Sequence, residues 1–333
     1  MTGTTLAETA QALVAEGKGI LAADESSPTI KKRFDSISID STEENRRDYR
    51  TMLFTADGAA SYISGVILFD ETIRQKAADG TALVEILKGK GIIPGIKVDQ
   101  GAKPLAGHPD ETVTEGLDGL RDRLNEYFEL GARFTKWRAV YRIGDDIPSP
   151  GCVSANAHAL ARYAALSQEA GLVPIVEPEV LMDGDHDIDA CEWITEEVQR
   201  AVFAELAIQD VELEGMLLKP NMVVSGKDCP EQAGVEEVAR RTVRTLKRAV
   251  PAAVPGIVFL SGGQSDEDAT LHLNAMNKLG EALPWKLSFS YGRALQAAPL
   301  KAWGGDATNV TAGQQAFLER AKANGEAATG SYA

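Results

Sequence analysis

The sequence has few cysteines and no long apolar run. Its three cysteines, Cys152, Cys191 and Cys229, lie far apart and form no CxxC pair, so they fit neither a disulfide framework nor a zinc ribbon. No run approaches the roughly 20 apolar residues that span a bilayer. The segment 1–17 lacks the basic region and long apolar core of a signal peptide. We therefore expect a soluble cytoplasmic protein with three reduced thiols.

Positive charge is also in short supply. The chain has 34 lysines and arginines against 49 aspartates and glutamates, a formal net charge of −15. Such a surface repels nucleic acid and anionic membranes, and we expect neither as a partner. An anionic small-molecule substrate would need a local concentration of lysine and arginine.

Clustered metal ligands are absent from the sequence as well. The four histidines, His108, His158, His186 and His272, are scattered, whereas a metal-assisted lyase needs grouped His or Cys ligands. The acidic segment DGDHD (183–187) is the one stretch that resembles a metal site. We interpret it as a turn and helix N-cap, because acidic residues favour a helix start. No metal is therefore expected.

Short apolar runs rich in β-branched residues alternate along the chain with longer segments of helical periodicity. The expected strands are 19–24, 65–69, 91–99, 134–143, 172–181, 215–223, 256–263 and 285–292. The expected helices include 42–57, 115–131, 154–171, 186–207, 234–250 and 265–283. Several of these open with Ser, Thr or Asp and end near Gly.

This alternation predicts an α/β fold: a parallel sheet closed as a (β/α)8 TIM barrel that forms a single domain over 1–333. A length prior of about 150 residues per domain would suggest two domains, but such barrels exceed it as one unit. An open doubly wound sheet is the alternative, disfavoured because no GxGxxG follows the first strand. We expect the Gly/Ala-rich segment 324–333 to be a flexible C-terminal tail.

Charged residues of both signs occur in five of the expected strands, toward what we take to be their C-terminal ends. Residues i and i+2 of a strand share a face, and the C-terminal ends of barrel strands form the catalytic mouth. A single lysine there is most often a solvated loop residue. Ionised groups are rarely buried unless paired, so a converging set indicates a catalytic cavity. The set is Asp24, Lys97, Lys136, Arg138, Glu177, Glu179 and Lys219.

Two lysines and a carboxylate in one cavity permit Schiff-base chemistry. A lysine attacks a carbonyl only as the free amine, and its ordinary pKa is about 10.4. A second ammonium about 4 Å away costs about 4 kcal/mol at an effective dielectric near 20. That energy corresponds to roughly 3 pKa units. We therefore expect one lysine to depress the pKa of the other.

Two glycine-containing loops predict a phosphate site. SGGQS (261–265) joins the seventh strand to a helix, and SYGR (290–293) joins the eighth strand to its helix. Loops at these positions of a barrel commonly bind phosphate through backbone N–H groups at helix N-termini. Arg293 adds a guanidinium suited to phosphate oxygens. The two loops together are a stronger signal than either one.

From Lys18 to about Trp303 the sequence closely resembles the class I fructose-bisphosphate aldolases, a family of aldehyde-lyases. Long matches in a fixed order are far more specific than one motif. They are GKGILAADES (17–26), NRRDYR (45–50), GVILFDET (65–72), GIKVDQG (95–101), KWRAVYRIG (136–144), VPIVEPEVLMDGDHD (173–187), LEGMLLKPNMV (213–223), FLSGGQS (259–265), LSFSYGRALQ (287–296) and LKAWGG (300–305).

The resemblance implies a role for each residue of the charged set. Lys219, in LLKPN, matches the lysine that forms the Schiff base, and Lys136 matches the neighbour that depresses its pKa and contacts substrate. Glu177 resembles the proton shuttle for carbinolamine formation and dehydration, and Asp24 the carboxylate that orders the site and assists carbon–carbon cleavage. Arg138 and Glu179 match the supporting network.

It also implies two phosphate sites. Ser261, Gly262 and Arg293 match the site for the substrate's 1-phosphate, and Gly263, Ser290 and Gly292 in the same loops are further candidates for substrate binding. The 6-phosphate site would include Ser26 and Lys97, with Arg33 as a neighbour.

The implied reaction is the reversible cleavage of fructose 1,6-bisphosphate to dihydroxyacetone phosphate and glyceraldehyde 3-phosphate, in glycolysis, gluconeogenesis or the Calvin cycle, without metal or organic cofactor. The family is usually homotetrameric. Many relatives continue into a mobile tail that ends in Tyr, whereas this sequence stops at Ala333; we expect its tail residue Tyr332 to be dispensable. Two alternatives stay open: another Schiff-base lyase or transaldolase with one phosphate site, and a non-catalytic scaffold that binds cytoskeleton or polyanions.

Overall fold

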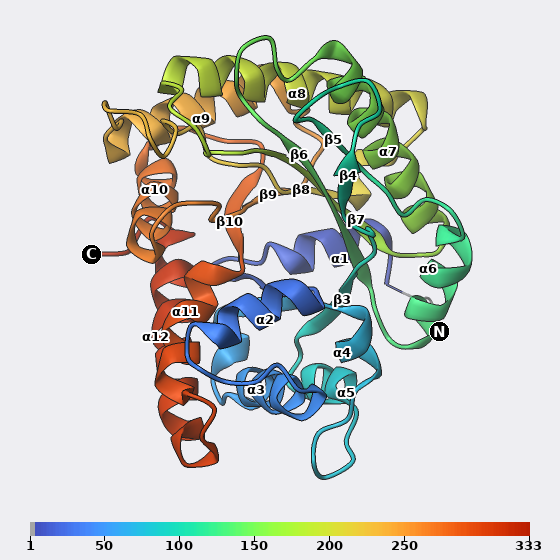
Figure 1. Ribbon diagram of the computed structural model, residues 1–333, viewed down its shortest axis with the longest axis vertical. Coiled ribbons are helices and arrows are strands. Elements are labelled where there is room, and N and C mark those ends of the chain that lie inside the picture. Colours follow the sequence, from blue (N-terminus) through green and yellow to red (C-terminus); the bar gives the residue numbers. More distant parts are fainter. Residues whose placement is uncertain (1–3) are drawn as a thin grey trace.

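A computed structural model describes residues 4–333. Eight parallel strands form a closed barrel in the order β1-β10-β9-β8-β7-β6-β3-β2, surrounded by helices (Figure 1). The closed sheet confirms the predicted TIM barrel and rules out the open doubly wound sheet. The strands are β1 (Gly19–Ala23), β2 (Ile63–Leu68), β3 (Ile93–Lys97), β6 (Phe134–Tyr141), β7 (Val173–Val180), β8 (Leu217–Leu218), β9 (Gly256–Phe259) and β10 (Lys286–Tyr291).

All the expected strands are present, although most are shorter than the apolar runs that predicted them. The helices are α1 (Leu6–Leu13), α2 (Ser27–Asp35), α3 (Glu43–Thr55), α4 (Asp70–Arg74), α5 (Leu83–Gly89), α6 (Leu120–Glu129), α7 (Pro150–Glu169), α8 (Ile188–Ile208), α9 (Val235–Ala249), α10 (Asp266–Lys278), α11 (Arg293–Trp303) and α12 (Val310–Ala327). A hairpin of β4 (Ala102–Pro104) and β5 (Thr112–Thr114), which the sequence reading missed, leaves the barrel after β3.

Helix starts follow the chemistry of the N-cap. The side chains of Thr42, Ser149, Asp187 and Ser265 each accept a hydrogen bond from a backbone N–H in the first turn of α3, α7, α8 and α10. The prediction that DGDHD starts a helix is therefore confirmed, because Asp187 is the N-cap of α8.

The barrel has its own apolar interior, separate from the layer between strands and helices. It includes Phe134 of β6, Val173 and Ile175 of β7, and Val258 of β9, and it continues into α1. Leu13 and Val14 close the end of the barrel where the strands begin. A Cβ placed on Gly256 would lie 2.5 Å from Val14, so glycine is required where α1 approaches. The opposite end is left open for polar side chains.

The C-terminal segment differs from the prediction of a flexible tail over 324–333. Residues 324–327 are the last turn of α12, in which Asn324 is fully buried and accepts a hydrogen bond from Thr270 of α10. Beyond the helix, Tyr332 packs against the core and its backbone exchanges two hydrogen bonds with the Asn274 side chain. The small residues of this segment permit close packing against α10.

The cysteines and the apolar character of the helices are two further features of the chain. Cys152, Cys191 and Cys229 are buried free thiols, as predicted. Within residues 4–333, no helix combines the length and the apolar character that crossing a membrane requires.

Candidate active site

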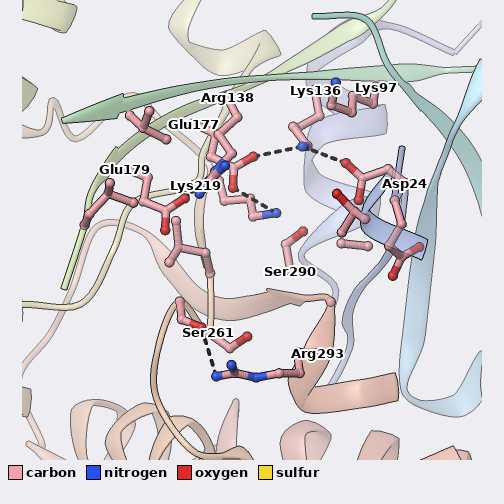
Figure 2. A pocket seen from close by; sticks show the side chains of 18 of the residues that line it. Asp24, Lys97, Lys136, Arg138, Glu177, Glu179, Lys219, Ser261, Ser290 and Arg293 are labelled. Atoms are coloured by element: carbon pink, nitrogen blue, oxygen red, sulfur yellow. Dashed lines mark hydrogen bonds and ion pairs between the residues drawn. The ribbon is translucent and has the colours of Figure 1, made fainter. Parts of the chain in front are cut away.

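A polar cavity of about 540 Å³ lies at the C-terminal end of the barrel strands. Figure 2 shows its charged side chains converging from different strands. Every residue predicted as catalytic or substrate-binding contributes to its wall. These are Asp24, Ser26, Arg33, Lys97, Lys136, Arg138, Glu177, Glu179, Lys219, Ser261, Gly262, Gly263, Ser290, Gly292 and Arg293.

Strand register explains how side chains at different positions along their strands meet. Lys136 is the third residue of β6, so the expectation that all seven charged residues lie near strand ends is wrong for this one. It pairs in register with Lys97, the last residue of β3. Strands β6 and β7 extend well past this level, and Arg138 pairs with Glu177. Lys136 therefore lies at the floor of the cavity rather than at its rim.

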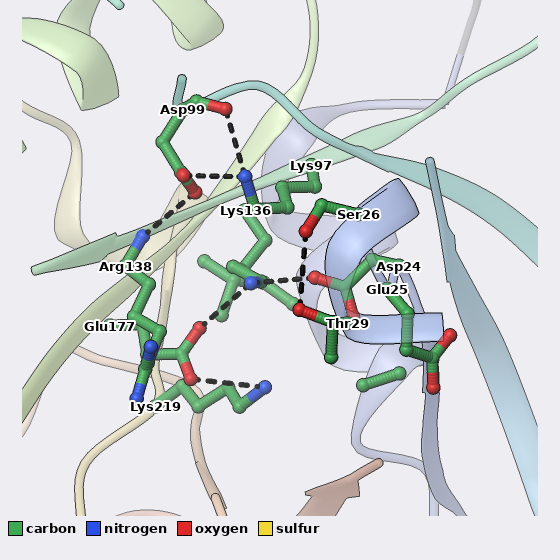
Figure 3. Close-up of polar contacts among 12 residues, drawn as sticks. Asp24, Glu25, Ser26, Thr29, Lys97, Asp99, Lys136, Arg138, Glu177 and Lys219 are labelled. Carbon is green, nitrogen blue, oxygen red and sulfur yellow. Dashed lines mark hydrogen bonds and ion pairs between the residues drawn. The ribbon is translucent and has the colours of Figure 1, made fainter. Parts of the chain in front are cut away.

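The floor holds a buried cluster of two lysines and two carboxylates. Lys136 Nζ lies 2.6 Å from Asp24 Oδ2 and 3.3 Å from Glu177 Oε2. The other oxygen of Glu177, Oε1, lies 3.3 Å from Lys219 Nζ. Figure 3 shows these contacts in line, with Glu177 between the two lysines. The Lys136, Lys219 and Glu177 side chains are only 4–5% exposed, so each charge depends on its partners.

The pKa values of the two lysines are shifted in opposite directions. Burial lowers the pKa of Lys219 below its ordinary value, and the Lys136 ammonium lowers it further, against the opposing carboxylates of Glu177 and Asp24. The pKa of Lys219 is lowered, as expected, but burial lowers it more than the neighbouring Lys136 does. Burial also acts to lower the pKa of Lys136, yet Asp24, Glu177 and Asp99 outweigh it and raise that pKa. Lys219 is thus the lysine suited to be a free amine.

Asp24 completes this arrangement as an ionised carboxylate. Burial alone would raise its pKa, but the ammonium groups of Lys136 and Lys219 outweigh burial and hold the pKa of Asp24 well below its ordinary value. The cavity floor therefore presents the Asp24 carboxylate beside the Lys136 ammonium, and Lys219 lies next to this pair, in contact with Glu177.

A second layer of ion pairs lies above the floor. Arg138 contacts Glu179 through its Nε, and Lys97 Nζ lies 2.5 Å from Asp99 Oδ1. Asp99 also accepts hydrogen bonds from the backbone N–H groups of Arg138 and Gly101. The sequence reading missed Asp99, although it stands two residues after Lys97 and the alternation of strand faces could have indicated it.

The loops after β9 and β10 lie side by side, as predicted for a phosphate site. Arg293 Nη2 donates hydrogen bonds to the carbonyls of Gly262, at 3.1 Å, and of Gln264, which ties the two loops together. α11 begins at Arg293, so its first backbone N–H groups lack partners within the helix. Ser290 is 1% exposed and its hydroxyl has no hydrogen-bond partner. An oxygen-rich ligand would satisfy these donors.

The candidate residues for a second phosphate lie on and beside α2. Ser26 Oγ lies 3.2 Å from Thr29 Oγ1, one turn further along, which the sequence reading did not include. Arg33 Nη1 lies 2.5 Å from Glu25 Oε1. A Cβ placed on Gly292 would be 3.4 Å from Arg33 Nη2. The Arg33 guanidinium therefore lies close to the loop after β10 as well as to the α2 segment that carries Ser26 and Thr29.

No group of three or more His, Cys, Asp or Glu side chains is placed to hold a metal ion anywhere in residues 4–333. His186, in the acidic segment, is half-buried, and burial lowers the pKa of its imidazole. The charged side chains that line the cavity are those of lysines, arginines, aspartates and glutamates.

The fold and this cavity define a TIM-barrel enzyme with a buried cluster of lysines and carboxylates at the C-terminal end of its strands. The family model described as "Fructose-bisphosphate aldolase class-I" matches residues 5–333, and the chain belongs to this family of lyases. It is 64% identical over 328 residues to a probable fructose-bisphosphate aldolase class 1 of Xanthomonas campestris, covering 98% of each chain.

More distant relatives carry the same description. The chain is 56% identical to fructose-bisphosphate aldolase B of Mus musculus, covering 98% of this chain and 90% of that one. Among solved structures, fructose-bisphosphate aldolase from Plasmodium falciparum, crystallised in complex with TRAP and a small-molecule inhibitor, superposes with a TM-score of 0.97 at 51% identity. That match covers 98% of this chain and 95% of the other.

Proposed function

We propose that this chain cleaves fructose 1,6-bisphosphate reversibly to dihydroxyacetone phosphate and glyceraldehyde 3-phosphate through a Schiff base on Lys219. The observation that carries the proposal is the buried contact of Lys219 with Glu177, next to the permanently charged pair of Lys136 and Asp24. A free amine, a proton shuttle and a fixed charge pair are what imine formation needs.

In the first stage the Lys219 amine attacks the substrate ketone. The new carbon–nitrogen bond gives a carbinolamine as the carbonyl oxygen takes up a proton and the nitrogen loses one. Glu177 lies within reach of Lys219 Nζ, at 3.3 Å, and shuttles these protons. Its protonated form then protonates the hydroxyl, which leaves as water, and an iminium remains on Lys219.

In the second stage the carbon–carbon bond breaks. A carboxylate removes the proton of the C4 hydroxyl, and the electrons of the C3–C4 bond move into the iminium, which becomes an enamine. We assign this stage to Asp24 because it is an ionised carboxylate that lines the cavity floor, 2.6 Å from Lys136. Glyceraldehyde 3-phosphate leaves, the enamine is protonated at C3, and water hydrolyses the resulting iminium to release dihydroxyacetone phosphate.

The basic groups around the cavity suit a substrate with phosphate at both ends. We assign Ser261, Gly262, Gly263, Ser290, Gly292 and Arg293 to the phosphate next to the ketone, and Ser26, Lys97 and Arg33 to the distal one. A chain with a net charge of −15 needs such a concentration to attract an anion. A Schiff-base lyase or transaldolase with a single phosphate site is the second candidate, and the group around Ser26 and Lys97 weighs against it.

We also propose a homotetramer that acts in the cytoplasm. On the described surface the exposed large hydrophobic side chains are Trp193, 65% exposed, and Ile208, 68% exposed, both on α8. Apolar groups of this size are typically covered in an assembly. Sedimentation velocity of the wild type and of Trp193→Glu tests this: a species of one size for both proteins would contradict a role of α8 in assembly.

Borohydride trapping tests the covalent step. Reduction in the presence of dihydroxyacetone phosphate should add the mass of the reduced adduct to the peptide that contains Lys219, and activity should persist in EDTA. Labelling of another lysine, or loss of activity on chelation, would overturn the mechanism. A single-turnover assay with fructose 1,6-bisphosphate separates an enzyme from a non-catalytic scaffold.

A further inference from the structure

An arginine outside the cavity wall makes contact with the segment that carries Asp24. Arg50 lies on α3 with only 1% of its side chain exposed. Its Nε donates to the carbonyl of Ala23 at 3.3 Å, and its Nη2 donates to the carbonyl of Glu25 at 3.2 Å. It therefore holds the backbone on both sides of Asp24.

The same guanidinium holds the side chain of Glu25. Arg50 Nη2 lies 3.4 Å from Glu25 Oε2, and Arg33 Nη1 lies 2.5 Å from Oε1. Gln296 of α11 donates through Nε2 to Glu25 Oε1 and to the carbonyl of Ala22, both at 2.7 Å. Figure 3 shows Glu25 pointing away from the Lys136–Asp24 pair. Glu25 thus forms ion pairs with the two arginines and not with the lysines of the cavity floor.

The charges in this group do not cancel. Arg33 and Arg50 share one buried carboxylate, which leaves a net charge of +1 next to the cavity. Arg33 Nη1 and Arg50 Nη1 are both buried without a hydrogen-bond partner, although Arg33 Nη1 forms an ion pair with Glu25, and unsatisfied buried donors cost free energy. Because Oε2 of Glu25 is held by Arg50, Arg33 meets one oxygen only. Its charge is then incompletely neutralised and can attract an anion in the cavity.

We propose that Arg50 is a positioning residue for Arg33: through the Glu25 carboxylate it fixes the Arg33 guanidinium in the cavity and keeps its positive charge available to a substrate phosphate. This inference rests on the proposed function, in which Arg33 binds phosphate. Without Arg50, Glu25 can turn both carboxylate oxygens to Arg33. The Arg33 guanidinium then loses its fixed position, and its positive charge is neutralised by Glu25 rather than available to phosphate.

Steady-state kinetics of Arg50→Met test the proposal. We expect KM for fructose 1,6-bisphosphate to rise about tenfold while kcat changes by less than about threefold, since lost ground-state binding appears in KM. Arg50→Lys, which restores the charge, should recover part of the loss. Arg46→Met is the matched control: Arg46 lies one turn earlier on α3, is 14% exposed and pairs with Glu71, outside the cavity. It should leave KM unchanged.

A double-mutant cycle makes the test specific. Arg33→Met and Arg50→Met act through one group, so the double variant should be no worse than Arg33→Met alone. Additive losses, a fall in kcat without a change in KM, or equal effects of Arg50→Met and Arg46→Met would overturn the proposal. Thermal unfolding identifies a variant that fails to fold. If Arg50→Met fails to fold, the same double-mutant cycle with Arg50→Lys in its place tests the proposal.

The proposed function can fail separately. If the wild type does not cleave fructose 1,6-bisphosphate, that function is wrong. The role of Arg50 is then tested by calorimetric binding of inorganic phosphate to the wild type and the same variants. Weaker binding in Arg50→Met but not in Arg46→Met would support it, and equal binding in all three proteins would overturn it.

Discussion

Lys219, the residue that follows β8, faces Glu177 in the adjacent strand β7, with Lys219 Nζ 3.3 Å from Glu177 Oε1. Burial lowers the pKa of Lys219, and the Glu177 carboxylate is the main influence that opposes it. The contact places Glu177 within reach of the nitrogen that must lose and gain protons during carbinolamine formation and dehydration.

Glu177→Gln should lower the pKa of Lys219 further, because it removes the carboxylate that raises this pKa while burial is unchanged. The fraction of free amine at neutral pH then increases, yet turnover should fall about 10²- to 10⁴-fold, since the proton shuttle is lost. The pH dependence of borohydride trapping at Lys219 measures the first effect and steady-state kinetics the second. A midpoint that moves to higher pH would contradict the assigned electrostatics.

Lys136→Met should have the opposite effect on titration. The Lys136 ammonium lowers the pKa of Lys219, and its removal also releases Asp24 and Glu177 from their contacts with Lys136, so that both carboxylates stabilise protonated Lys219 more strongly. The midpoint of trapping should therefore move to higher pH, with less adduct at neutral pH. Arg138→Met is a useful control, because Arg138 pairs with Glu179 and is not among the groups that shift Lys219. An equal shift in both variants would show that the effect is not specific to Lys136.

The two phosphate assignments predict different substrate patterns. Arg293→Ala should reduce kcat/KM about ten- to a hundredfold for fructose 1-phosphate and fructose 1,6-bisphosphate alike, since a hydrogen bond to a charged group is worth roughly 1.5–3 kcal/mol. Lys97→Ala should damage cleavage of the bisphosphate selectively. It also leaves Asp99, now without its ammonium partner, as a negative charge beside the distal phosphate.

The exposed Lys88, which pairs with Glu85 on α5, provides the matched control for these measurements. Lys88→Ala should change neither substrate, and its value sets the size of a nonspecific effect of losing one positive charge. Equal losses for both substrates in Lys97→Ala would show that Lys97 does not belong to a second phosphate site.

The barrel was predictable because each strand is a short apolar run, but some boundaries depend on backbone conformations that composition does not show. α6 begins at Leu120 rather than 115, since Gly116 and Gly119 have φ values of +130° and +66° and interrupt the helix. β8 ends at Leu218, well before the predicted 223. The backbone N–H of Lys219 still donates to the Val176 carbonyl, but Pro220 has no N–H to extend the ladder.

The cavity residues were predictable to the extent that they follow strand alternation or match the family's motifs. Glu25 and Asp99 were missed as parts of the site because their importance lies in what they hold, and those partners come from other elements. Arg50 and Gln296 reach Glu25 from α3 and α11, and no local pattern at residue 25 predicts that meeting. The extent of burial at Lys219 is likewise a property of the closed barrel. The sequence therefore predicts the effect of the neighbouring lysine on the pKa of Lys219, but not the larger effect of burial.

Tyr332, beyond the end of α12, packs against α10, where its hydroxyl donates to Glu267 Oε1 at 3.0 Å and its backbone N–H donates to the Asn274 side chain at 3.2 Å. The Glu267 hydrogen bond raises the pKa of its phenol. Tyr332 does not line the cavity, and an anchored phenol of raised pKa is a poor proton donor for an enamine on Lys219. We expect Glu177, or water held by it, to return that proton.

Tyr332→Phe should therefore leave both cleavage of fructose 1,6-bisphosphate and tritium exchange into dihydroxyacetone phosphate nearly unchanged. Deletion of 331–333 should do the same, with a small loss of thermal stability from the lost contacts to Asn274. A deletion from residue 328 is a poorer test, because Ala328 also packs against the core and its removal confuses stability with catalysis. A selective collapse of exchange and turnover in Tyr332→Phe, with unfolding unchanged, would show instead that this phenol reaches the enamine and supplies the proton.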